Sequence, residues 1–229
     1  MQKNFLFFVM IFAWAFSINL FATPQQDSIT NFTPIQQKTI IKKIQVCLFE
    51  NEPKLYVLKG KDTLELTAKN NQVFIHETKK TKRTETLKIS HSLLSISKTK
   101  KLSSLYPGTL IISAKNGKLK VINDVDIEEY LRGVVPYEIG TLDEERFEAL
   151  KVQAVAARTY AYRHLGSRQA LGFDVYADTR DQVYNGLSNA TPLTDKAIQE
   201  TKGEILVYNN EPIQAYYHST CAGHTESTI

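Results

Sequence analysis

The sequence predicts an α+β protein: a β-rich N-terminal portion followed by a core of mixed helices and strands. Short runs of alternating apolar and polar residues dominate from Thr39 to Asn123, and apolar residues at helical spacing begin after Asp126. The 229 residues suffice for one or two domains, and their composition is that of a globular protein. We therefore expect a β-rich part over residues 39–124 and a motif-bearing core over 125–229.

The N-terminal residues predict an export segment that lies outside the fold. One early positive charge precedes the apolar run Phe5–Phe16, and the small residue Ala22 stands shortly before a proline. Leu20 is a poor residue for a cleavage site after Ala22, so residues 1–22 are expected to be a signal peptide or an uncleaved anchor. The protein is expected in the periplasm or cell envelope, meeting a membrane only through an uncleaved segment. Residues 23–38 have no periodicity and are expected to form a linker.

Turn residues divide the β-rich part into short strands. The pair Asn116–Gly117, between two alternating runs, is the strongest hairpin indication in the chain. Basic residues gather between Lys79 and Lys101 against the single acid Glu85. This run is typical of the solvated face of a hairpin, and it could also attract an anionic wall polymer or a membrane surface. Nucleic acid is not an expected partner of an exported chain.

Three helices are expected in the core. Asp126 caps a short amphipathic helix that Gly133 and Pro136 should end. A longer helix is expected over about residues 144–165, where apolar and small residues recur at helical spacing. A third begins at Thr191, with a proline at its first position.

The last residues predict a strand pair turned at Asn209–Asn210. Nothing near Ile229 resembles the end of a domain, so we expect a truncated portion of a longer protein. The chain has two cysteines, Cys47 and Cys221. They could pair in an exported protein, but two separate thiols are expected, with Cys47 buried in a strand.

Glu138 is the prime candidate for chemistry. In "EYLRGVVPYEIG" it follows an apolar run. Pro136 restricts the backbone before it, and Gly140 leaves the backbone after it flexible. A carboxylate held against apolar surface without a partner has a raised pKa, which a general acid requires. The alternative is a surface acid that caps the following helix.

Lys151 and Arg158 lie two turns apart on the same face of the long helix. If that face lines a groove above Glu138, both are donors for sugar hydroxyls, an acetamido oxygen or a lactyl carboxylate. Otherwise they are solvated. A cation beside Glu138 would lower its pKa, so Arg158 is expected to contact substrate or another acid instead.

Two further stretches carry polar side chains. The loop "DTRDQVYNG" offers Gln182 and Tyr184 for ligand contact, although it also suits a plain turn. In "YYHSTCAGH", His218, Cys221 and His224 recur at intervals of three, which gives only three metal ligands, partly on a strand whose faces alternate. A thiol hydrolase using Cys221 is conceivable, but nothing positions a third group. No metal and no cofactor are expected.

Four motifs resemble, in order and spacing, the stage II sporulation protein D family, which also includes amidase enhancer proteins. The resemblance covers roughly Thr109 to the end and rests on "VDIEEYLRGVVPYEIG", "EALKVQAVAARTYA", "GFDVYADTRDQVYNG" and "AYYHSTCAGHTES". It implies a lytic transglycosylase of peptidoglycan acting on glycan strands stripped of stem peptides, in spore engulfment or septal remodelling. The alternative is a non-catalytic peptidoglycan-binding module that stimulates a wall amidase.

The resemblance also implies roles for individual residues. Glu138 would be the catalytic acid, and the substrate-binding residues would include Lys151, Arg158, Tyr217, His218 and Ser219. Hydrolysis of a glycosidic bond usually takes two carboxylates, whereas a lytic transglycosylase needs one acid because the substrate's C6 hydroxyl closes on the anomeric carbon.

One departure from the family concerns metal. Its zinc-binding members carry cysteine, and histidine followed by cysteine, at the positions of Tyr176, Arg180 and Asp181 here. The resemblance therefore implies a zinc-free branch.

Overall fold

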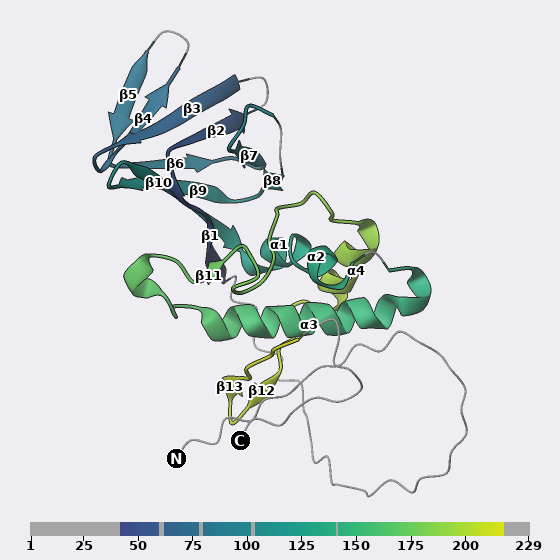
Figure 1. Cartoon of the computed structure of the whole chain (residues 1–229). Coiled ribbons are helices and arrows are strands. Elements are labelled where there is room, and N and C mark those ends of the chain that lie inside the picture. The colour runs from purple at the N-terminus through teal and green to yellow at the C-terminus, as the bar shows by residue number, and fades with distance from the viewer. Residues whose placement is uncertain (1–41, 60–61, 78–79, 102–103, 141, 218–229) are drawn as a thin grey trace, which may run out of the picture.

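The computed structural model describes residues 42–59, 62–77, 80–101, 104–140 and 142–217. Two β-sheets come first and a group of helices follows them (Figure 1). The α+β class and the β-rich N-terminal portion are confirmed. Within these residues, no helix is long and apolar enough to cross a membrane.

One sheet has five strands in the order β11-β1-β10-β9-β6. Its long central pair is antiparallel, and the short β11 lies parallel to β1. The predicted hairpin joins β9 to β10, because Asn116 and Gly117 have φ angles of 52° and 72°, as this two-residue turn requires. The strands are β1 (Lys43–Glu52), β6 (Thr86–Ser90), β9 (Thr109–Lys115), β10 (Lys118–Asp126) and β11 (Val175–Tyr176).

The other sheet has six strands in the order β5-β4-β3-β2-β7-β8. Buried residues of both sheets share one apolar core, among them Val57 and Leu66 from this sheet and Leu110 and Leu119 from the first. Alternation of buried and exposed positions along the strands produces this core. The strands are β2 (Lys54–Lys59), β3 (Asp62–Lys69), β4 (Gln72–His76), β5 (Thr81–Thr84), β7 (Leu94–Ser97) and β8 (Leu105–Tyr106).

The helices form a layer beside the sheets. Figure 1 shows α1, α2 and α4 between the β-rich part and the long helix α3. The helices are α1 (Ile127–Arg132), α2 (Val135–Ile139), α3 (Phe147–His164) and α4 (Pro192–Glu200), with single 3-10 turns at Glu144–Arg146 and Gln169–Leu171. The strand pair β12 (Val207–Tyr208) and β13 (Glu211–Pro212) follows, turned at two asparagines with positive φ as predicted.

Local sequence explains where these helices begin. Asp126 accepts the N–H of Glu128 at 2.9 Å at the start of α1, and Thr191 forms the expected cap of α4. The first helix ends at Gly133 as predicted, but the expectation that Pro136 helps to end it is wrong. Pro136 lies in the first turn of α2, where its missing N–H has no helical partner to lose.

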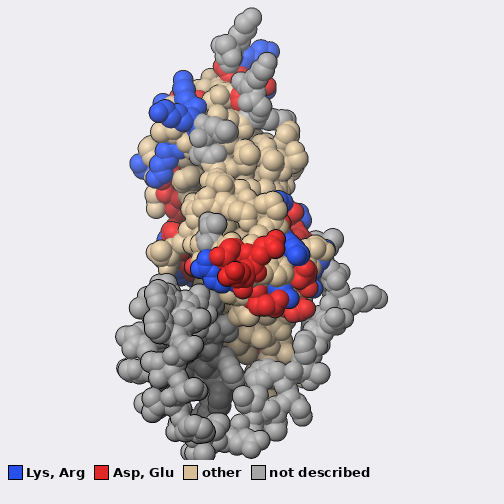
Figure 2. Space-filling view, turned by 90° about the vertical axis from the view of Figure 1, so that its right-hand side faces the viewer, with Lys and Arg blue, Asp and Glu red and all other residues tan. Residues whose placement is uncertain are grey.

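Charge is unevenly distributed over the surface. Acidic side chains gather around the N-terminal end of α3, and lysines and arginines lie over the β-rich part (Figure 2). Negative charge near a helix N-terminus is stabilising, so Asp143, Glu144, Glu145 and Glu148 have an electrostatic explanation that does not involve catalysis. In the basic run, Lys82 and Lys98 pair with Glu77 and Glu52.

Gly133 allows the close packing that connects the first helices to the loop opposite. A Cβ atom at this position would lie 2.5 Å from the ring of Tyr184 and 2.7 Å from the carbonyl oxygen of Gly186. The Tyr184 hydroxyl donates to Asn123 at 2.8 Å, which fixes the ring in place. Gly133 has an ordinary φ of −97°, so the restriction is steric.

Gly133→Ala should therefore destabilise the fold by about 1–3 kcal/mol, as overpacking does. The free energy of unfolding in urea measures the loss. In a Tyr184→Leu background the same substitution should be less costly, because part of the obstruction is gone. Equal losses in both backgrounds would contradict the steric explanation.

Candidate functional site

Glu138 lies near the end of α2, half-buried beside the loop that follows β11. Val135 and Pro136, at the start of this short helix, are buried. The N–H of Val183 donates to Glu138 Oε1 at 2.7 Å. Among the ion pairs between described residues, none involves Glu138. Burial therefore raises the pKa of Glu138, and the Val183 N–H opposes part of that rise.

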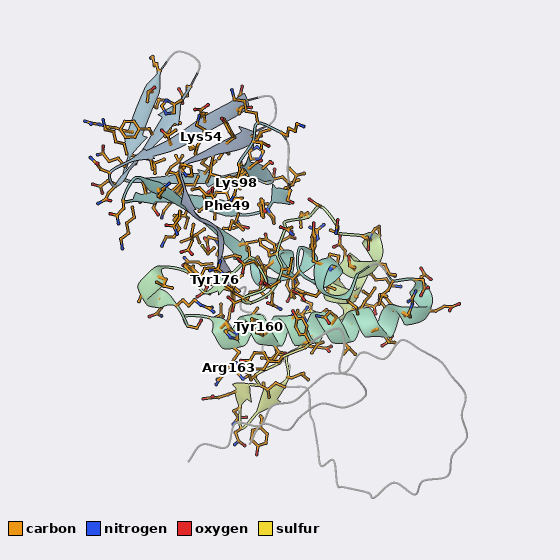
Figure 3. All side chains as sticks on the ribbon, viewed as in Figure 1. Phe49, Lys54, Lys98, Tyr160, Arg163 and Tyr176 are labelled. Atoms are coloured by element: carbon orange, nitrogen blue, oxygen red, sulfur yellow. The ribbon has the colours of Figure 1, made fainter. Side chains whose placement is uncertain are left out.

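A cavity of about 360 Å³ opens at the Glu138 carboxyl group. Its walls come from α2, α3, the loop after β11 and the segment after β13. The lining residues are Glu138, Tyr160, Thr179, Arg180, Asp181, Val183, Ala215, Tyr216 and Tyr217. Figure 3 shows Tyr160 on α3 and Tyr176 on β11.

Asp181 anchors the loop that carries Val183. Its carboxylate accepts the Tyr160 hydroxyl at 2.8 Å and the Tyr176 N–H at 2.8 Å, and it pairs with Arg168 at 3.0 Å. The Asp181 side chain is only 1% exposed. These contacts tie the loop to α3 and hold the Val183 N–H against Glu138.

Gln182 and Tyr184 were expected to contact a ligand, but the structure turns both side chains inward. Gln182, 1% exposed, accepts from Tyr130 at 3.1 Å and donates to the Tyr217 hydroxyl at 2.8 Å. Tyr184 is fully buried against Gly133. In this conformation neither side chain offers surface to a ligand, because alternate residues of the loop face the core.

Tyr217 lies in the cavity wall, beside Glu138. Burial raises the pKa of Tyr217, and the negative charge of Glu138 adds to the rise. The hydroxyl therefore stays protonated at neutral pH. Its predicted neighbours His218 and Ser219 lie outside the described residues, as do Cys221 and His224.

Lys151 and Arg158 do share one face of α3, but that face is directed toward α4. Lys151 pairs with Glu148 at 2.9 Å and with Glu200 at 3.7 Å. Neither cation lines the cavity at Glu138. The expectation that both point into a groove above Glu138 is therefore wrong, because helical spacing does not say which neighbour covers a face.

Arg158 is the largest fully buried side chain of the described residues. It binds both carboxylate oxygens of Glu128, at 2.9 and 2.8 Å. It also donates to the carbonyl oxygens of Ile198 and Glu204, both at 3.2 Å. The expected acidic partner is thus Glu128, and no side-chain surface is left for substrate in this conformation.

Arg158→Met should lower the free energy of unfolding by about 3–5 kcal/mol, because it leaves the Glu128 carboxylate and buried carbonyl groups without their donor. Chemical denaturation measures this loss. Arg163→Met is the matched control: Arg163 is on the same helix, is 41% exposed, and among the described residues pairs only with the exposed Glu211, so its loss should stay below about 1 kcal/mol. Similar losses for the two variants would contradict a structural role for Arg158.

Sequence reasoning missed several cavity residues. Thr179, Arg180 and Asp181 lie in the loop that the sequence marked as ligand-binding, but at different positions of it. The sequence around Tyr160 and Tyr216 does not indicate a place in a cavity, because Tyr160 lies in a regular helix and Tyr216 in a strand-like run.

Comparisons with known proteins find sequence similarity over part of this chain. Residues 115–208 match the family model described as "SpoIID: Stage II sporulation protein". Residues 115–208 are therefore similar to this family. "Stage II sporulation protein D" of Bacillus subtilis (strain 168) is 34% identical over 121 residues, covering 46% of this chain and 35% of that protein.

Two other relatives extend the comparison. "Amidase enhancer" of Bacillus subtilis (strain 168) is 41% identical over 99 residues, covering 43% of this chain and 13% of that protein. An uncharacterized protein of Brachyspira hyodysenteriae is 42% identical over 123 residues, covering 53% of this chain and 33% of that protein. The chain thus spans about a third or less of the length of these relatives. No solved structure matches significantly.

Tyr176, Arg180 and Asp181, the positions where the resemblance implies zinc ligands in other family members, make contacts here without metal-ligand chemistry. The Arg180 guanidinium lies 3.4 Å from the ring centre of Tyr176, and Asp181 accepts the Tyr176 N–H. A permanent cation at Arg180 does not fit a metal ligand set. Among the described residues, no cluster of three metal-ligating side chains occurs.

Cys47 is buried on β1, as the strand pattern predicted. Burial, with a smaller contribution from Glu50, raises the pKa of its thiol to about 12, so it is a poor nucleophile at neutral pH. Its relation to Cys221 lies outside the described residues.

The raised pKa of Glu138 predicts a dependence of stability on pH. The folded state holds the Glu138 proton more tightly than the unfolded chain, so wild type loses stability as pH rises from about 4.5 through the folded pKa. Glu138→Gln lacks this titration and should gain stability relative to wild type over the same window. Urea unfolding at a series of pH values measures the difference.

The exposed Glu145→Gln is the control for this comparison. A difference between Glu138→Gln and wild type that does not change with pH would contradict a raised pKa at Glu138.

Proposed function

We propose that this chain cleaves peptidoglycan glycan strands by lytic transglycosylation, with Glu138 as the acid. The observation that carries the proposal is a half-buried carboxyl group with a raised pKa, free of ion pairs with described residues, in the wall of a cavity. Relatives named for stage II sporulation and for amidase enhancement support a wider role in cell-wall remodelling during sporulation.

The second carboxylate of the cavity favours a mechanism with one acid. Asp181 is ion-paired with Arg168 and accepts hydrogen bonds from Tyr160 and Tyr176. These contacts occupy both of its carboxylate oxygens and leave it little capacity to attack a sugar or activate water. A hydrolytic pair of carboxylates is therefore poorly supported, whereas transglycosylation needs only Glu138.

Glu138 would act twice in this reaction. Its protonated carboxyl group gives the proton to the glycosidic oxygen between N-acetylmuramic acid and N-acetylglucosamine as that bond to the anomeric carbon breaks. The C6 hydroxyl oxygen of the muramic acid residue then bonds to the same carbon, and its proton returns to Glu138. The products are a 1,6-anhydro-muramic end and a free hydroxyl on the leaving sugar. The Val183 N–H would stabilise the intervening carboxylate.

The other walls of the cavity suit a sugar chain. Tyr160, Tyr216 and Tyr217 present aromatic surface with polar tips, which can cover the apolar faces of sugar rings and bond their hydroxyls. Tyr216 is 42% exposed and so is available at the rim. A wall substrate also fits the export that the N-terminal sequence predicts, and we place the protein's action in the cell envelope.

Glu138→Gln should lower the rate of product formation by about 10²–10⁴-fold, the usual contribution of a general acid. Purified protein is incubated with glycan strands stripped of stem peptides, and mass spectrometry detects anhydro-muramic ends. Glu145→Gln, an exposed acid outside the cavity, serves as the control. The proposal fails if wild type yields no anhydro-muramic ends, or if Glu138→Gln is as active as wild type.

A second candidate is a non-catalytic module that binds glycan and stimulates a wall amidase. The 41% identity to a protein named amidase enhancer favours it. Glycan binding without product, undiminished in Glu138→Gln and accompanied by a faster amidase reaction, would support this candidate over the enzyme.

A further inference from the structure

The cavity at Glu138 contains one cation among its described lining residues, Arg180. The two cations expected from the sequence lie elsewhere, Lys151 with two acids and Arg158 in the core. Any recognition of negative charge by the described walls of this cavity therefore depends on Arg180.

Two contacts hold the Arg180 guanidinium in place. Its Nε and Nη2 atoms donate hydrogen bonds to the Asp178 carboxylate at 2.9 and 2.7 Å. The flat face of the group lies against Tyr176, 3.4 Å from the ring centre. Such stacking fixes the orientation of the planar guanidinium group, so little side-chain entropy remains to be lost when a ligand binds.

One nitrogen of this group stays available. The hydrogen bonds of Arg180 to described residues use Nε and Nη2, and Nη1 lies 3.9 Å from Glu50, beyond hydrogen-bonding distance. The side chain is 54% exposed. Nη1 can therefore donate to an acceptor in the cavity while Asp178 keeps the guanidinium oriented.

We propose that Arg180 is a specificity-determining residue that binds the carboxylate of an acidic sugar in the cavity at Glu138. The inference rests on the proposed function and specifies its substrate. Muramic acid carries a lactyl carboxylate, which is negative when free and becomes a neutral amide when a stem peptide is attached. Arg180 would thus recognise stripped strands by a negative charge that only they present at the lactyl position.

Arg180 and Glu138 do not interfere with one another. Burial and the Val183 N–H set the pKa of Glu138, and the charge of Arg180 is not among the causes. A carboxylate bound in the cavity would bring a negative charge toward Glu138, and this charge would favour the protonated form of Glu138 further. Asp178 and Glu50 already reduce the positive charge, so the expected discrimination is on the order of tenfold.

The test measures binding in the Glu138→Gln background, where turnover does not interfere. One ligand is an oligosaccharide of alternating N-acetylglucosamine and N-acetylmuramic acid with free lactyl carboxylates. The other is the same oligosaccharide with each lactyl group converted to its methylamide. Calorimetry should give a dissociation constant on the order of tenfold lower for the free acid.

Adding Arg180→Gln should abolish the preference, so that both oligosaccharides bind alike. Arg180→Lys keeps the positive charge but loses the planar guanidinium group, so it should retain part of the preference for the free acid. Arg163→Gln is the matched control, since Arg163 leaves α3 on the side of β13, away from the cavity (Figure 3).

A preference that survives Arg180→Gln, or an absence of binding by either oligosaccharide, would overturn the inference. The proposed function is judged separately, by product formation in wild type. If the Glu138→Gln protein binds with the expected preference but wild type releases no product, Arg180 keeps its role and the catalytic proposal fails.

Discussion

The buried guanidinium of Arg158 is the contact on which the arrangement of the site depends. From α3 it binds Glu128 at the start of α1 and the carbonyl oxygens of Ile198 and Glu204, at and beyond the end of α4. The chain that leaves α1 continues into α2 and so positions Glu138, whereas the chain that follows Glu204 leads to the opposite wall at residues 215–217. One buried cation thus fixes both walls relative to α3. A buried charge of this kind is tolerated only when every donor is used, which explains why the partners come from so many elements.

Two carboxyl groups occur among the described lining residues of the cavity, and their surroundings differ. Asp181 pairs with the Arg168 cation and accepts hydrogen bonds from the Tyr160 hydroxyl and the Tyr176 N–H. Glu138 receives one N–H and is otherwise desolvated, which favours the neutral acid. A pair of acids whose environments differ in this way divides the labour between structure and proton transfer. The two carboxyl groups are also linked geometrically, because the loop that Asp181 anchors places the Val183 N–H against Glu138.

Much of the fold and one part of the site follow from local sequence. The turns at Asn116–Gly117 and Asn209–Asn210 and the cap at Thr191 are local rules of backbone chemistry, and Glu138 was recognisable from its apolar neighbours. The orientation of a side chain within a loop depends on distant residues instead. Gln182 turns inward because Tyr130 and Ala157, on two different helices, offer it partners. The burial of Arg158 likewise depends on Glu128, thirty residues earlier in the chain.

The loop after β11 combines these long-range effects. A metal can fix such a loop by binding ligands from several of its residues, but here side chains perform that task. The guanidinium groups of Arg168 and Arg180 both contact Tyr176, at 5.3 and 3.4 Å from its ring centre, while Asp181 accepts the Tyr176 N–H. Because the loop is ordered by the protein's own contacts, binding of a ligand need not supply the free energy to order it. The same stacking presents the free edge of Arg180 to the cavity. The side chains that stabilise the loop therefore also equip it to select a ligand.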